Sequence, residues 1–153
     1  MKSLLLILIA TSACLFACTN TSKTETASST EATIALSNLK GIWKLSFVAP
    51  GAKPLDSIYP EIKPELEIED SLKFRGFTSC NGFNGSFTLD SNRISFPASM
   101  AMTRMVCQGE GERIFLEALH KTTSFSISTD TVLSFKTGDT ILLRFTHTPA
   151  IVE

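Results

Sequence analysis

The stretch from Phe74 to Phe87, FRGFTSCNGFNGSF, constrains the fold of this chain more than any other. It places three glycines, two asparagines and one cysteine between two apolar, strand-like flanks. Glycine and asparagine tolerate positive φ angles, so such a cluster predicts tight turns or bulges rather than a plain strand. The segment Thr103–Cys107 holds the other cysteine found beyond residue 18. We therefore expect these two stretches to meet in the folded protein.

The N-terminus has the features of a bacterial lipoprotein signal peptide, residues 1–17. Lys2 precedes the apolar run Leu4–Ala10, which is too short to span a bilayer. The following Leu15-Phe16-Ala17-Cys18 resembles a lipobox, whereas an ordinary signal-peptidase site needs a small residue where Leu15 stands. We expect Cys18 to become the acylated first residue, held in the membrane by several acyl chains. A plain secretory peptide is the alternative.

Residues 18–33 are predicted to form a flexible tether. They are almost entirely Thr, Ser and Ala with a few charges, and they show no apolar periodicity that could build a core. Thr19, at position +2, is not the Asp linked with retention in the inner membrane. This favours the outer membrane, with the protein facing the periplasm.

Residues 34–148 are predicted to form one globular domain. The chain is 43% hydrophobic and 19% charged, with a net charge of −1, which is typical of an ordinary folded domain. It has no dense basic run, so a nucleic-acid partner is not expected.

The apolar pattern predicts a mostly β, α+β domain. Apolar residues alternate with polar ones in strand-length segments that short polar turns separate, as in Trp43–Phe47. Leu66 and Ile68 are expected to pair with Leu72 and Phe74 across a polar turn. One helix is expected over residues 110–122, where apolar residues recur at helical spacing. The order of strands, helix and strands predicts a curled or barrel-like antiparallel sheet with one helix.

Cys80 and Cys107 are predicted to form a disulfide, because an exported domain with two cysteines pairs them in an oxidising compartment. Two free, buried thiols are the alternative. A reactive thiol is not favoured, since the chain has no Cys-x-x-Cys motif. A metal site built from these cysteines with His120 and His147 is not expected either, because no two of the four have zinc-ligand spacing.

Three further residues are candidates for a binding motif. Arg104 lies among methionines and Val106, so if it is buried it needs partners. It either anchors an anionic ligand or pins the turn against Cys107, and the structural role is favoured. Asn81 and Asn84 admit the same choice between binding a ligand and capping their own turn.

Several motifs, in this order and spacing, resemble the META domain of HslJ-like bacterial envelope proteins. They are the Gly-x-Trp-Lys-Leu opening at Gly41–Leu45, the Gly-x-x-x-Cys-Asn-x-x-x-Gly turn from Gly76 to Gly85, the Thr-Arg-Met-x-Cys segment at Thr103–Cys107 and a helix that opens with Glu112. The resemblance spans about residues 36–145. It implies an exported or lipid-anchored protein, in some members linked to heat shock or novobiocin tolerance, with no agreed enzymatic activity and no cofactor.

The sequence thus predicts a non-enzymatic, lipid-anchored envelope protein that supports stress or antibiotic tolerance by binding a protein or a surface component. The alternative is a carrier that holds a small apolar ligand inside the curled sheet, because the chain has eleven phenylalanines that could line such a cavity. No nucleophile elbow or phosphate-binding loop is present in the sequence.

Overall fold

The computed structural model describes residues 33–49, 53–129 and 131–148. The predicted signal peptide, Cys18 and the tether up to residue 32 lie outside the described residues. Within those ranges, no helix has the length and hydropathy needed to cross a membrane.

The described strands form one antiparallel sheet in the order β5-β6-β8-β9-β10-β1-β2-β3-β4-β7. The strands are β1 (Gly41–Val48), β2 (Glu65–Ile68), β3 (Lys73–Phe77), β4 (Gly82–Ser86), β5 (Thr88–Asp90), β6 (Arg93–Ser95), β7 (Ala101–Met102), β8 (Ser124–Ser128), β9 (Val132–Thr137) and β10 (Thr140–Thr148). This confirms the mostly β fold class predicted from the alternating pattern.

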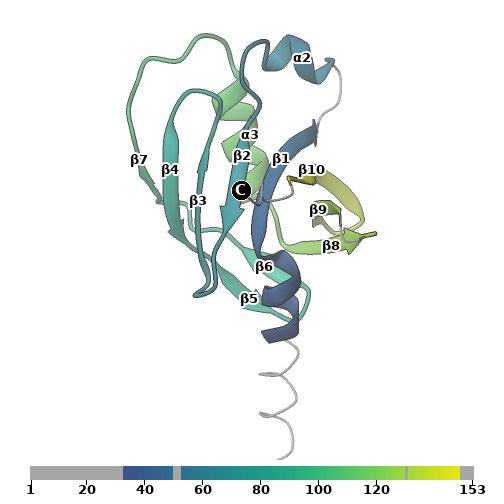
Figure 1. Ribbon diagram of the computed structural model, residues 1–153. Coiled ribbons are helices and arrows are strands. Elements are labelled where there is room, and N and C mark those ends of the chain that lie inside the picture. The colour runs from purple at the N-terminus through teal and green to yellow at the C-terminus, as the bar shows by residue number, and fades with distance from the viewer. Residues whose placement is uncertain (1–32, 50–52, 130, 149–153) are drawn as a thin grey trace, which may run out of the picture.

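The sheet curls because a single residue joins its first strand, β5, to β4, the last strand but one. In the strand order, β5 is first and β4 is ninth of ten. In the chain, however, only Phe87 separates β4 from β5. The two ends of the sheet therefore lie close together, and the sheet becomes barrel-like (Figure 1). Strand β7 is left as an edge strand beside β4.

The first part of β1 follows the period of two that the sequence predicts, but a bulge after Leu45 leaves Phe47 only half-buried, and β9 buries three consecutive residues, Leu133–Phe135. In β1, Trp43 and Leu45 are buried, whereas Lys44 and Ser46 are exposed.

The β2–β3 hairpin differs from the expectation at one residue. Ile68 pairs with Phe74 as predicted, but Leu72 lies in the turn with a φ of 56°. The turn therefore includes Leu72, because the chain needs a left-handed residue there to reverse its direction.

The predicted helix is present as α3 (Gly111–His120), with Phe115, Ala118 and Leu119 buried against the sheet. Two helical segments were not predicted: α2 (Leu55–Ile58) and residues 33–39. The latter ends at the buried Leu39, whose carbonyl oxygen accepts a hydrogen bond from Nε1 of Trp43 at 2.8 Å.

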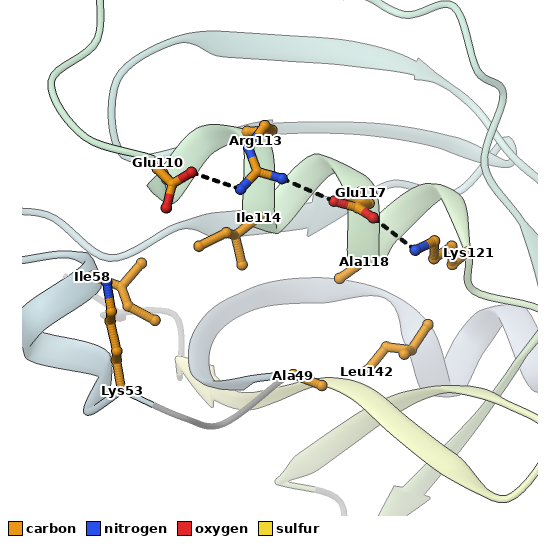
Figure 2. Close-up of a pocket in the computed structure, with 10 residues that line it drawn as sticks. All are labelled: Ala49, Lys53, Ile58, Glu110, Arg113, Ile114, Glu117, Ala118, Lys121 and Leu142. Carbon is orange, nitrogen blue, oxygen red and sulfur yellow. Dashed lines mark hydrogen bonds and ion pairs between the residues drawn. The ribbon is translucent and has the colours of Figure 1, made fainter.

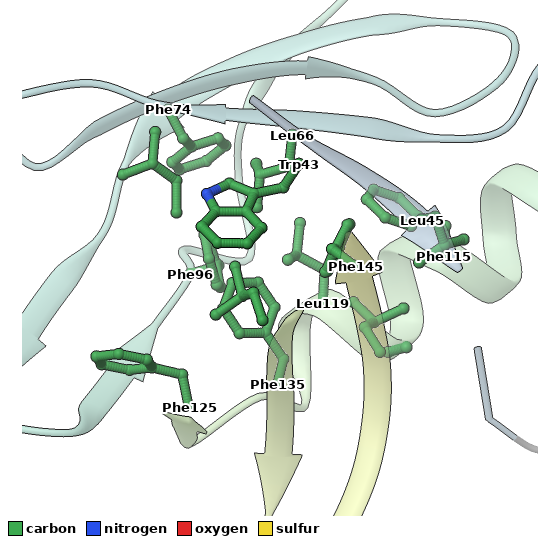
Figure 3. Close-up of a cluster of buried hydrophobic side chains, with 14 of the residues drawn as sticks. Trp43, Leu45, Leu66, Phe74, Phe96, Phe115, Leu119, Phe125, Phe135 and Phe145 are labelled. Atoms are coloured by element: carbon green, nitrogen blue, oxygen red, sulfur yellow. The ribbon is translucent and has the colours of Figure 1, made fainter. Parts of the chain in front are cut away.

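Aromatic rings fill the space that the curled sheet and α3 enclose (Figure 3). Phe96 touches Phe74 and Phe135 at centroid distances of 5.2 and 5.3 Å, and Phe145 lies between Phe135 and Phe115 at 5.5 and 6.4 Å. Burying each such side chain contributes about 1.5–3 kcal/mol. The phenylalanines thus form a continuous core that holds α3 against the sheet.

Candidate functional site

The turn between β3 and β4 is held by its own polar residues. The backbone N–H of Thr78 donates to the carbonyl oxygen of Asn81 at 2.9 Å, and the N–H of Asn81 donates to Oγ1 of Thr78 at 3.0 Å. Between them, Ser79 has a φ of 90°, a conformation that costs a non-glycine residue about 1–2 kcal/mol. The turn is therefore tight and locally strained, in agreement with the glycine and asparagine cluster in the sequence.

The side chain of Asn81 points away from this turn and binds the backbone of a second segment. It is 2% exposed, and its Oδ1 accepts hydrogen bonds from the N–H of Met105 and from Oγ1 of Thr103, both at 2.8 Å. Its Nδ2 donates to the carbonyl oxygen of Met105 at 3.2 Å and to Oε2 of Glu112 at 3.0 Å. One amide thus holds both backbone groups of Met105, as a neighbouring strand would.

Glu112 connects the same turn to α3. It lies in the first turn of α3, where the helix dipole favours a negative charge. Its carboxylate accepts hydrogen bonds from Nδ2 of Asn81 and from the hydroxyl of Thr78. The buried polar groups of the turn therefore satisfy one another across three segments of the chain.

Cys80 and Cys107 form the predicted disulfide, with their Cα atoms 5.8 Å apart. It joins the two segments that Asn81 also joins, so the contact between them is both covalent and hydrogen-bonded. Both sulfurs lie within 4.8 Å of a carboxylate oxygen of Glu112, a grouping that could hold a metal ion. With the sulfurs bonded to each other, no thiolate is available as a ligand.

Three side chains of the Thr103–Cys107 segment are exposed to solvent, although Asn81 binds the backbone of this segment. Met105 is 58% exposed and Val106 is 92% exposed. Arg104 is exposed as well, and its guanidinium has no hydrogen-bond or ion-pair partner among the described residues. Arg104 therefore does not pin the turn. We call Arg104, Met105 and Val106 the exposed tip.

A cavity of about 390 Å³ lies beside the exposed tip. It brings together two of the predicted site residues, Asn81 and Arg104. Its apolar walls come from three methionines in and before the Thr103–Cys107 segment and from one leucine of α3: Met100, Met102, Met105 and Leu116. Asn84 does not line this cavity; it is exposed on β4, opposite Arg75 and Ala101.

A second cavity, of about 560 Å³, was not predicted from the sequence (Figure 2). Its apolar floor combines Ile114 and Ala118 of α3 with Leu142 of β10. Charged residues of α3 and of its two flanking positions also line this cavity: Glu110, Arg113, Glu117 and Lys121. Arg113 contacts Glu110 at 2.8 Å and Glu117 at 3.1 Å.

The charged side chains on the surface of α3 form ion pairs with one another. The hydrogen bond from Lys121 lowers the pKa of Glu117 below its ordinary value, and the charge of Lys121 adds to this effect. On the outer surface of the sheet, the hydrogen bond from Arg75 likewise lowers the pKa of Glu67. These are surface ion pairs, which contribute little to stability.

Residues 35–149 match the META domain family. Two solved structures share the fold. An NMR structure of a protein from Burkholderia xenovorans is 24% identical, with a TM-score of 0.57, over 76% of this chain and 88% of that one. A crystal structure of a DUF4847 family protein from Bacteroides vulgatus is 12% identical, with a TM-score of 0.53, over 72% of this chain and 94% of that one. Among curated proteins, none matches this chain.

The family match covers most of the chain, and the disulfide-linked turn and the Thr103–Cys107 segment both lie inside the matched range. The chain belongs to the META domain family.

Proposed function

We propose that this META-family protein is a lipid-anchored component of the bacterial envelope that supports stress or antibiotic tolerance by binding another protein. The binding surface is the exposed tip, Arg104-Met105-Val106, together with the cavity beside it. The function is one of binding and involves no catalysis.

The observation that carries this proposal is the contrast between the backbone and the side chains of the tip. The backbone of Met105 is held through both its N–H and its carbonyl oxygen, and a disulfide follows two residues later. The side chains of Met105 and Val106 are nevertheless exposed to solvent. A rigid segment that exposes apolar groups is typical of an interaction surface, because exposing them to water costs free energy that a partner recovers.

The chemistry of the tip and cavity suits a protein partner. Methionine side chains are flexible and polarisable, and they adapt to different apolar surfaces. Arginine is enriched at protein interfaces, and the guanidinium of Arg104 is unoccupied within the described chain. By contrast, the hydrogen-bonding atoms of Asn81, Thr78 and Glu112 are used within the protein, which supports a structural role for them rather than acid–base chemistry.

The location rests on the N-terminal sequence. Leu15-Phe16-Ala17-Cys18 has the pattern of a lipobox, and the following polar residues would let the domain stand away from a membrane surface. A carrier that holds an apolar ligand inside the curled sheet receives less support, because aromatic side chains occupy that interior.

Site-specific photocrosslinking in cells under envelope stress tests the proposal. A photoreactive amino acid at position 106 should give discrete crosslinked species, because Val106 would face the partner. The matched control places it at Ile62, another exposed apolar residue, which is 53% exposed. Identical crosslinks from both positions, or none from position 106, would refute a binding role for the tip.

The lipid anchor is tested by a separate experiment. The Cys18→Ser variant should be released from the membrane fraction, and continued membrane association of this variant would contradict lipidation.

A further inference from the structure

We infer that the partner contributes an extended strand, which pairs with the edge of β7, places an apolar side chain in the methionine-lined cavity and sets a carboxylate against Arg104. This inference rests on the proposed binding function and specifies the chemistry of the partner.

The backbone groups of β7 leave one edge of this strand available for pairing. Strand β7 pairs with β4 on one side and ends the strand order on the other (Figure 1). The N–H of Thr103 donates to the carbonyl oxygen of Gly82, so Thr103 faces β4. Backbone groups alternate in direction along an antiparallel strand, so the N–H and carbonyl groups of Met102 face away from β4. They are placed to pair with an added strand.

The side chains beside this edge line a cavity. Met102 of β7 lines the cavity of about 390 Å³, together with Met100, Thr103, Arg104 and Met105 from the residues on either side of the strand. Side chains of alternate residues lie on one face of a strand. A peptide that pairs with β7 would direct every second side chain toward this same face. Leu116 of α3 also lines the cavity, so an apolar side chain placed there would contact both the methionines and this leucine.

The charges at the cavity favour an acidic peptide. Glu112 also lines the cavity, but its carboxylate accepts hydrogen bonds from Asn81 and Thr78. Arg104 has no such partner among the described residues. An arginine binds a carboxylate through two parallel hydrogen bonds, which favours an acidic residue in the peptide and disfavours a lysine.

A second copy of this chain is a poorer occupant, because Arg104 favours a carboxylate. Residues 97–107, which flank and include β7, read PASMAMTRMVC and contain no Asp or Glu. Two copies paired through β7 would therefore bring no carboxylate to Arg104 from these segments. The segment is held by hydrogen bonds and a disulfide, so it loses little conformational entropy when a strand binds to it.

A peptide array on the full mature, oxidised protein tests the inference. Nine-residue peptides alternate an apolar residue (Val, Leu or Phe) with Glu in one set and with Lys in the other. We expect the Glu peptides to bind about tenfold or more tightly than the Lys peptides, as a charged hydrogen-bonded pair implies. Arg104→Glu should reverse this order, whereas the control Lys73→Glu, an exposed charge on β3, should leave it unchanged.

Backbone N-methylation of the bound peptide tests the strand pairing itself. Methylating one alternate set of peptide residues should abolish binding, and methylating the other set should leave it intact, because only one set faces β7. Amide NMR shifts should change in residues 100–106 and in β4. Equal binding of Glu and Lys peptides, tolerance of both methylated sets or shifts located elsewhere would overturn the inference. If position 106 still gives specific crosslinks in cells, the proposed function survives that failure.

Discussion

The side-chain amide of Asn81 lies 3.0 Å from Oε2 of Glu112, although 31 residues separate the two in the chain. This hydrogen bond joins the turn between β3 and β4 to the first turn of α3. The same amide holds the backbone of Met105, so one buried side chain determines how three segments meet. The geometry of the exposed tip therefore depends on a residue that is itself almost inaccessible.

Replacing this amide by a carboxylate should destabilise the protein strongly. Asn81→Asp removes the Nδ2 donor and places a second negative charge beside Glu112, so we expect the free energy of unfolding to fall by about 2–4 kcal/mol at neutral pH. The loss should shrink in acid, where one carboxyl becomes protonated. Denaturant unfolding measures it, with Asn84→Asp as the control at an exposed asparagine of β4. Equal effects of the two substitutions would contradict the role of Asn81.

Removing the disulfide should cost stability but leave the tip in place. For cysteines 27 residues apart, the chain-entropy model gives a loss of about 3–4 kcal/mol for the Cys80→Ser, Cys107→Ser double variant. The N–H of Met105 should stay protected from hydrogen exchange, because Oδ1 of Asn81 still accepts its hydrogen bond. The wild-type protein should show the same loss when a thiol reductant is added, and the variant should not respond. Full exchange at Met105 in the variant would show that the disulfide alone holds the segment.

Gly76 should not tolerate a side chain. A Cβ atom there would overlap the carbonyl oxygen of Glu65 and lie 2.6 Å from the ring of Phe83, so the backbone of β2 or β3 would have to move. We expect Gly76→Ala to lower the free energy of unfolding by about 2 kcal/mol or more. Gly82→Ala is the control, since its Cβ would meet no atom closer than 3.9 Å. Thermal unfolding distinguishes the two, and similar melting temperatures would count against the close contact.

Tyr59 should make the fold sensitive to alkali. Its buried hydroxyl donates to the carbonyl oxygen of Gly111 at 2.9 Å, and burial raises the pKa of Tyr59 well above its ordinary value. An unfolded tyrosine ionises near pH 10, so the stabilisation is complete below about pH 10 and is lost as the pH rises further. The chain has one tyrosine and one tryptophan. Tyrosinate absorbance should therefore rise together with the unfolding that Trp43 fluorescence reports.

The matching control is Tyr59→Phe. It removes the ionisable hydroxyl, so its stability should depend less on pH above 10, although loss of the hydrogen bond to Gly111 should lower stability at neutral pH by about 1 kcal/mol. Tyrosinate that forms in the wild-type protein well before unfolding would contradict the burial of this hydroxyl.

Much of the fold could be predicted from local patterns. The alternation of Trp43 and Leu45 with polar residues predicted β1, and the helical spacing over residues 110–122 predicted α3. Strand β7 could not be predicted in this way. It has two residues and no pattern of its own, and it is a strand because Ala101 and Met102 pair with β4, far away in the chain. The helix α2 is likewise too short, at four residues, to show a helical period.

The candidate site was only partly predictable. The two cysteines and the cluster of glycine and asparagine marked where two segments meet, and the structure confirms the disulfide. The sequence expectation that Arg104 needs partners assumed that it is buried, whereas the fold exposes it. The cavity on α3 was not predicted because its floor combines residues from α3 with Leu142 of β10. The sequence of either segment alone does not indicate that the two lie side by side.

The sequence by itself determined the elements whose cause is local: alternating strands, one amphipathic helix, turns rich in glycine and asparagine, and a lipobox-like N-terminus. Only the tertiary structure decided which way each side chain of the Thr103–Cys107 segment points. That choice depends on Asn81, which holds the backbone of Met105 from a position 24 residues earlier in the chain. A hydrogen bond across such a separation leaves no periodic pattern in the sequence, because it depends on where the curled sheet brings the two segments together.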